Sequence, residues 1–226
     1  MRQRAVTVLI LVLGILLLCT DEAMAWRKRN KRTEPKTEAA ISVAEGATPI
    51  LGEPQVSVDR MWEFVRTVNA DFPREIAQAY YDIGQKYGVR GDIALCQSIV
   101  ETGWFLFGGG TAVTPDQHNY CGLGVTSRGM KGISFQSMEE GVTAQIQHLY
   151  AYACRSHIPA GESLVDPRFY LVSRGIAPSW EELNLKWAMN DRYGQSILAL
   201  FRKMCGAEPI VVENIGIEIP EEYLDQ

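Results

Sequence analysis

Residues 94–104, ALCQSIVETGW, carry a single carboxylate beside an apolar helical stripe. Gln97, Glu101 and Trp104 are spaced i, i+4 and i+7, which places them on one face of a helix. Because the neighbouring stripe is apolar, we expect Glu101 at the edge of a core, where loss of water raises the pKa of a carboxyl group. A carboxyl that keeps its proton near neutral pH can act as the general acid of a glycosidase. The alternative is an ordinary glutamate that faces water at a helix end.

The composition limits the classes of partner. The chain has 226 residues, of which 46% are hydrophobic, enough for one domain of medium size. Its net charge of −5 does not favour nucleic acid as a partner. The three histidines lack the spacing of zinc ligands, and the sequence has no CxxC or HExxH motif. We therefore predict no metal and no cofactor.

The N-terminus has the pattern of a signal peptide over residues 1–25. Arg2 and Arg4 precede an apolar run over 5–18, and Ala23-Met24-Ala25 fits a cleavage site. The run is shorter than the roughly twenty residues of a membrane span, although an uncleaved anchor remains the alternative. We expect cleavage after Ala25 and a secreted or cell-envelope protein.

Four cysteines follow the predicted cleavage site: Cys96, Cys121, Cys154 and Cys205. Four cysteines allow three pairings, and the sequence does not choose among them. Export permits disulfides but a domain of this size does not require them.

Charge and periodicity divide the rest of the chain. Residues 26–56 lack periodicity and are predicted to be a flexible linker, with a basic run at 27–32 that is either a solvated tether or a contact for anionic envelope polymers. A catalytic domain is predicted over 57–206, followed by an acidic tail over 207–226.

Helical spacing recurs through the predicted domain. Helices are expected over 58–70, 73–87, 92–104, 137–156, 179–187 and 193–204, the fourth and fifth opening with capping boxes at Ser137 and Ser179. Residues 105–135 are rich in glycine and are predicted to form a turn, a short strand and a hairpin. The expected fold is mainly α (α+β), a helical body with a small glycine-rich β-lobe. A cleft between them would suit an extended polymer.

Four ordered motifs resemble a known family. QSIVETGW, NYCGLG, SFQSMEEGVTAQIQHL and WAMNDRYG are similar to motifs of the bacterial endo-β-N-acetylglucosaminidases, which include cell-wall autolysins and flagellar peptidoglycan hydrolases. The resemblance extends from Val58 to Met204. It implies a lysozyme-like fold and a monomer that cleaves the β-1,4 bond after N-acetylglucosamine in peptidoglycan glycan strands.

The resemblance also implies roles for individual residues. Glu101 matches the catalytic acid, and Tyr193 matches a tyrosine that lines the cleft and would orient the 2-acetamido group of the substrate. Gly141 stands where the family often has serine, and Thr102 where it usually has serine. Substrate contacts are predicted for Gln97, Trp104, Asn119, Tyr120, Phe135 and Asp191.

The second catalytic group is not evident. Many glycosidases use two carboxylates, yet residues 119–138 contain no Asp or Glu. The remaining candidates are Asp116, Glu139, Glu140 and Asp191. In substrate-assisted glycosidases the 2-acetamido group itself attacks the anomeric carbon, and we favour this mechanism.

Two other functions remain open. A lytic transglycosylase also uses a single glutamate on a lysozyme-like body but forms an anhydro sugar. A glycan-binding envelope protein without activity is the alternative from another class. The sequence does not reveal the biological role of the hydrolysis.

Overall fold

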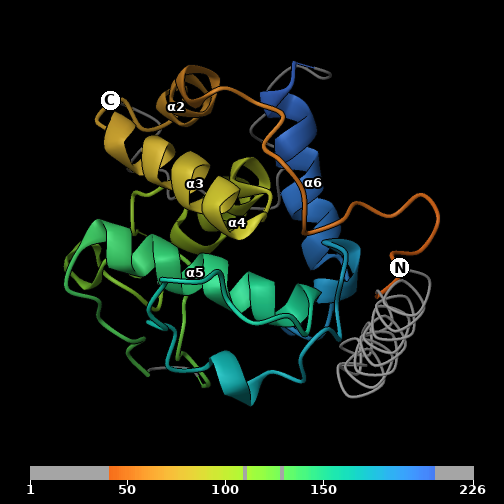
Figure 1. Ribbon diagram of the computed structural model, residues 1–226. Helices are drawn as coiled ribbons and strands as arrows, with labels where there is room; N and C mark the ends of the chain where they lie inside the picture. The colour runs from red at the N-terminus through yellow and green to blue at the C-terminus, as the bar shows by residue number, and fades with distance from the viewer. Residues whose placement is uncertain (1–40, 109–110, 128–129, 207–226) are drawn as a thin grey trace, which may run out of the picture. The chain divides into compact units, whose positions relative to one another are not determined.

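The computed structural model describes residues 41–108, 111–127 and 130–206 (Figure 1). The predicted signal peptide, the basic run at 27–32 and the acidic tail at 207–226 lie outside these residues. Within the described ranges, no helix is both long and apolar enough to cross a membrane.

Among the described residues, five α-helices make the body, each near a predicted helix: α2 Val58–Arg66, α3 Arg74–Tyr87, α4 Gly91–Thr102, α5 Met138–Ala153 and α6 Tyr193–Met204. The helix α2 begins where the Ser57 hydroxyl accepts a hydrogen bond from the Arg60 N–H, 3.3 Å away, which satisfies a free amide at the helix start. The helix α3 ends at Gly88, which adopts a left-handed conformation with φ 63°. The mainly α fold class is therefore confirmed.

Helix α4 lies at the centre of the described helices. It packs against α2, α3 and α6, and α5 also packs against α3 (Figure 1). Ten of its twelve residues are buried, because a helix covered on several sides has no face left for water. Only the last turn, with Val100 and Glu101, is partly exposed. The packing thus leaves the end of α4 as the place where a side chain can meet both core and solvent.

The capping box at Ser179 opens a shorter element than predicted. The N–H and hydroxyl of Ser179 both donate to the Glu182 carboxylate, at 3.1 and 3.0 Å. However, only the 3-10 helix η3, Glu181–Leu183, follows, and the prediction of a helix to residue 187 was wrong. Leu185 takes a left-handed conformation with φ 58°, which a helix cannot contain. Trp187 consequently lies on a loop.

The glycine-rich lobe contains turns and the 3-10 helix η1, Pro115–Gln117. The predicted strands are not found in its described residues, so the β character of the lobe is not confirmed. Backbone bonds instead join single points: Ile133 donates to Leu123 at 2.8 Å and Phe135 donates to Gln117 at 2.9 Å. A small second core closes the lobe against α5 and contains Cys121, Leu123, Phe135 and Ala144.

Residues 41–56 of the predicted linker are described by the structure, and part of this segment is packed on the domain. Ile50 is fully buried. Its N–H donates to the carbonyl of Pro178 and its carbonyl accepts from the N–H of Arg90, both at 2.9 Å. These bonds fix the segment between two distant parts of the domain, so the packed chain begins before residue 57.

The four described cysteines are free thiols, three of them buried. Burial raises the pKa of the Cys96 and Cys121 thiols well above the ordinary value. These two residues therefore behave as small apolar groups.

Candidate active site

Glu101 and Tyr193 meet where the last turn of α4 faces the first residue of α6. The phenol of Tyr193 donates a short hydrogen bond to Oε1 of Glu101, although the two residues are 92 positions apart in sequence. The close packing of α4 on α6 brings them together. The structure thus joins the two residues predicted to be catalytic.

The environment of Glu101 keeps its carboxyl partly protonated near neutral pH. Burial raises the pKa of Glu101 from 4.5 to about 7, while hydrogen bonds from Tyr193 and from the side chain of Trp187 act in the opposite direction. Burial and the adjacent Glu101 carboxylate raise the pKa of Tyr193 well above 10. Tyr193 therefore remains a proton donor to Glu101 over the working pH range.

A buried chain of amides fixes the direction of that hydrogen bond. Nε2 of Gln145 donates to the carbonyl of Ala94 at 3.2 Å and to Oε1 of Gln97 at 2.9 Å. Since a carbonyl can only accept, the amide nitrogen of Gln145 must face Ala94. Gln97 then presents its own nitrogen to the hydroxyl of Tyr193, at 2.9 Å. The single proton of the phenol is left to point at Glu101.

The far end of this chain is also satisfied. The hydroxyls of Tyr80 and Ser98 lie 2.6 and 2.9 Å from Oε1 of Gln145 and can donate to it. The four side chains of this network are fully buried: Tyr80, Ser98, Gln145 and Gln97. A buried polar network with every member bonded is rigid, because each broken bond would leave an unpaired polar group.

The lobe reaches the acid through Gly122. This residue has φ 66°, and a Cβ placed there would lie 3.6 Å from Oε2 of Glu101. The NYCGLG turn therefore passes directly over the carboxyl oxygen that Tyr193 does not contact. Glycine here allows both the left-handed conformation and the close approach of backbone to the carboxyl.

Asn119 holds this turn from inside the lobe. Its amide nitrogen donates to the carbonyls of Leu123 and Ile133, at 2.9 and 2.8 Å, and its oxygen accepts from the Leu123 N–H at 2.9 Å. The residue is fully buried. Asn119 thus bonds the backbone where strand pairing was predicted, which gives it a structural role; its predicted contact with substrate stays a prediction.

Three further residues predicted to bind substrate are buried. Trp104 is fully buried and packs on Phe64 with 5.4 Å between ring centroids. The left-handed conformations of Gly103 and Trp104, with φ 57° and 61°, turn the chain after α4, and the indole lies in the core. Tyr120 and Phe135 are likewise buried. The burial of these side chains leaves them little surface for a substrate, and their predicted substrate contacts stay predictions.

The other two predictions have different outcomes. Gln97 is buried and contacts Tyr193, so it acts behind the site. Asp191 is exposed on the loop before α6. Neither is placed by the structure in contact with Glu101.

Sequence reasoning missed Trp187. Its side chain lies close enough to the Glu101 carboxyl to lower the pKa of that group, and its ring packs on His148 and Tyr152 of α5, with 5.0 and 5.7 Å between centroids. His148 in turn is paired through Nδ1 with buried Asp166, at 2.7 Å. The signal was present, since a tryptophan lies six residues before Tyr193 in WAMNDRYG, but an expected helix placed it elsewhere.

The candidates for a second carboxylate lie apart from Glu101. The hydrogen bonds that act on the pKa of Glu101 come from Tyr193 and Trp187, and no acidic group contributes. Glu140 accepts from the N–H of Gln136 at 2.6 Å, which gives it a capping role. Glu139 and Asp191 are exposed.

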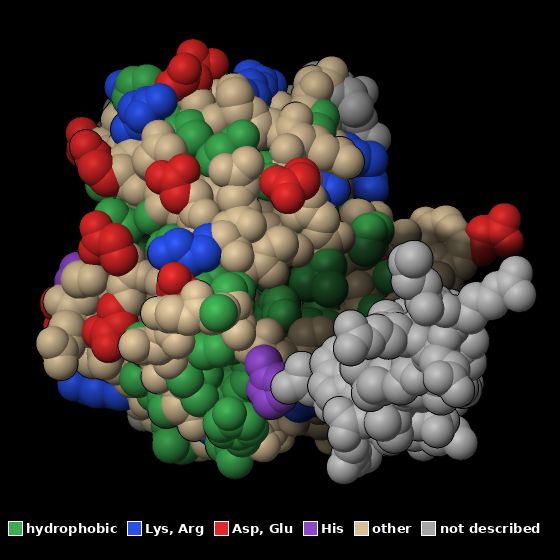
Figure 2. Space-filling model, viewed as in Figure 1, with side chains coloured by type: hydrophobic (Ala, Val, Ile, Leu, Met, Phe, Trp, Pro, Cys, Tyr) green, Lys and Arg blue, Asp and Glu red, His purple; other side chains and the backbone are tan. Residues whose placement is uncertain are grey.

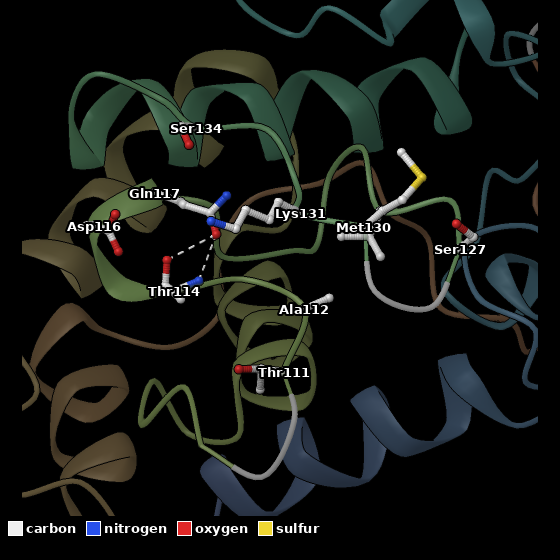
Figure 3. A pocket seen from close by; sticks show the side chains of 10 residues that line it. Thr111, Ala112, Thr114, Asp116, Gln117, Ser127, Met130, Lys131 and Ser134 are labelled. Carbon is white, nitrogen blue, oxygen red and sulfur yellow. Dashed lines mark hydrogen bonds between the residues drawn. The ribbon is translucent and has the colours of Figure 1, made fainter.

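Asp116 lines a separate hollow of about 600 Å³ on the lobe, of which Glu101 is not part. Figure 3 shows Asp116 near one end and Ser127 near the other, with Lys131 between them. A hydrogen bond from Thr114 lowers the pKa of Asp116. Asp116 is thus ionised and belongs to the lobe surface. Among the described residues no cluster of His, Cys, Asp and Glu could hold a metal ion.

The geometry is that of a glycosidase acid: one carboxyl with a raised pKa, held by a phenol, beneath a glycine turn. Residues 77–205 match the glucosaminidase family, described as mannosyl-glycoprotein endo-beta-N-acetylglucosaminidase. The match covers more than half of the chain, so the protein belongs to this family, as its motifs predicted.

One relative shares much of this domain. An uncharacterized protein of Borreliella burgdorferi is 40% identical over 130 residues, which is 58% of this chain and 62% of the relative. The chain therefore spans about three fifths of the length of that relative. No solved structure matches the chain.

Proposed function

We propose that this protein is an exported peptidoglycan hydrolase that cleaves the β-1,4 bond after N-acetylglucosamine in bacterial glycan strands. The observation that carries the proposal is the Glu101 carboxyl, which has a pKa of about 7 and accepts a hydrogen bond from Tyr193. Family membership supports the reaction class, and the sequence pattern over residues 1–25 supports export.

The two oxygens of Glu101 would have different tasks. Oε1 accepts the hydrogen bond from the Tyr193 hydroxyl. This leaves Oε2, on the side of Gly122, to carry the proton that the acid donates. Glu101 donates this proton to the glycosidic oxygen as the bond to the anomeric carbon breaks. Proton donation of this kind contributes about 10² to 10⁴ in rate.

The nucleophile in this proposal is the substrate's own 2-acetamido oxygen. It attacks the anomeric carbon and forms an oxazolinium, which water opens while returning a proton to Glu101. Support comes from the lack of an acidic group among the causes that set the pKa of Glu101. Tyr193 was predicted to orient the acetamido group, but its only proton is directed at Glu101. We therefore assign it the positioning of the acid.

Two measurements on purified peptidoglycan test the proposal. Mass spectrometry of the products should find reducing N-acetylglucosamine ends; anhydro sugars would indicate a lytic transglycosylase, and no product would favour a glycan-binding protein. NMR of the first product should find the β-anomer, since substrate assistance retains configuration. An initial α-anomer would require a protein base, and Asp116 and Asp191 would be examined first.

A further inference from the structure

A cavity of about 220 Å³ lies between the C-terminal part of α5, the 3-10 helix η2 and the loop after η3. η2 spans Phe169–Leu171. Hydrophobic side chains gather over the lower part of the molecule in Figure 2, where η2 lies in the same view of Figure 1. The residues that define the cavity chemically are His148, Tyr152, Arg168, Leu171, Ile176 and Lys186.

The cavity carries positive charge that the described residues do not neutralise. Within these residues, the guanidinium of Arg168 has no hydrogen bond or ion pair. Burial raises the pKa of Tyr152, and the nearby charge of Arg168 offsets part of this rise. Lys186 donates only to a backbone carbonyl, that of Glu182 at 2.8 Å. His148 is already paired with Asp166. In a chain with a net charge of −5, two cations without carboxylates at one cavity indicate an anionic ligand.

The cavity is linked to the catalytic acid by one side chain. Trp187 packs on His148 and Tyr152, which line the cavity, and its side chain lies close enough to Glu101 to lower the pKa of that carboxyl. A substrate bound at Glu101 would therefore extend substituents toward this cavity past the indole. The apolar part of its wall includes Leu171 and Ile176, which are 70% and 45% exposed, and such a wall suits short aliphatic groups.

We propose that this cavity binds a carboxylate carried by the N-acetylmuramic acid unit, with Arg168 as the main contact. Arginine pairs with a carboxylate through two parallel hydrogen bonds, a geometry that its planar fork favours. The carboxylate belongs to the stem peptide, or to the lactyl group where the peptide has been removed. The inference rests on the proposed function, because it concerns the substituents of the same substrate.

Kinetics of the full chain on three soluble substrates test the inference: glycan strands with stem peptides, the same strands after removal of the peptides, and oligomers of N-acetylglucosamine, which have no carboxylate. Arg168→Gln should raise KM for the peptide-bearing strands about tenfold or more, as expected for loss of a charged hydrogen bond. It should leave the cleavage of N-acetylglucosamine oligomers unchanged. Arg155→Gln removes an exposed arginine that does not line the cavity, and should behave as wild type on all three.

The substrate arms distinguish the two sources of the carboxylate. An effect of Arg168→Gln on peptide-bearing strands only identifies the stem peptide; an equal effect on peptide-free strands identifies the lactyl group. Unchanged KM on both, or an equal loss on all three substrates, would overturn the inference.

A binding measurement separates this inference from the proposed function. NMR titration of the wild type with a muramyl tetrapeptide should shift the indole signal of Trp187, and Arg168→Gln should weaken the binding about tenfold. The same peptide with its carboxylates amidated offers Arg168 no carboxylate, so it should bind the wild type and Arg168→Gln equally weakly. Binding without any cleavage would count against the hydrolase proposal and in favour of the cavity, whereas cleavage without Arg168-dependent binding would refute the cavity alone.

Discussion

Tyr193→Phe should move the alkaline limit of activity to higher pH. A general acid is active only while protonated, so the rate falls as pH rises through the pKa of Glu101, about 7. The phenol donates to the carboxylate and lowers this pKa. A hydrogen bond to a charged group contributes about 1.5 to 3 kcal/mol, and one pKa unit corresponds to about 1.4 kcal/mol. Removal of the hydroxyl should therefore raise the alkaline limit by about 1 to 2 pH units.

The assay is the dependence of kcat/KM on pH, measured on a soluble glycan substrate. A range of roughly pH 4 to 10 includes both the ordinary pKa of a glutamate and the raised pKa expected in the variant. We also expect a lower rate at the optimum, because Glu101 loses the group that orients it. Tyr150→Phe is the control, since that buried phenol donates to the carbonyl of His157 at 3.0 Å, away from Glu101. An unchanged alkaline limit in Tyr193→Phe, or a limit at lower pH, would refute the assignment of Glu101 as the acid held by Tyr193.

Three further changes test other parts of the site. Glu101→Gln should reduce hydrolysis by at least about a hundredfold and yet increase the free energy of unfolding at pH 8 by about 2 to 3 kcal/mol. The pKa of Glu101 is raised in the folded state, so the stability that its protonated carboxyl contributes is complete below about pH 4.5 and is lost as pH rises through about 7. Equal urea midpoints of the variant and the wild type at pH 8 would contradict this expectation. Gln145→Leu should shift the alkaline limit of activity in the same direction as Tyr193→Phe, because Gln97 is no longer oriented. The control Gln147→Leu removes another buried amide of α5 and should destabilise the fold without shifting the alkaline limit. Gly141→Ala should lower the free energy of unfolding by about 1 to 3 kcal/mol, because a Cβ there would lie 1.7 Å from the carbonyl oxygen of His118; calorimetry that finds no change would show that the lobe can move away.

The clash at Gly141 explains one departure from the family pattern. The start of α5 lies against the backbone of the lobe at His118, and a serine at this position would meet that carbonyl. The sequence marks the difference but gives no reason for it, because the close approach joins two segments that are not neighbours in the chain.

The sequence by itself determined the helices and the acid. The spacing of apolar residues is a local signal, and it predicted α2, α3 and α4 near their observed places. The position of Glu101 at the end of an apolar stripe likewise predicted a partly buried carboxyl with a raised pKa. Such features depend on residues within one or two turns of each other, so the sequence contains them.

Only the tertiary structure decided which side chains meet Glu101. Trp104, three residues away, was predicted to line the site, but the left-handed turn after α4 places its indole in the core. Trp187 and Tyr193 reach the acid from distant segments. Trp187 does so on the loop that replaces the expected helix at Leu185, and Tyr193 does so through the packing of α6 on α4. The glycine-rich stretch has the composition of a hairpin, yet Asn119 satisfies its backbone groups in place of a paired strand. These outcomes follow from packing between elements, which the periodicity of any single element does not encode.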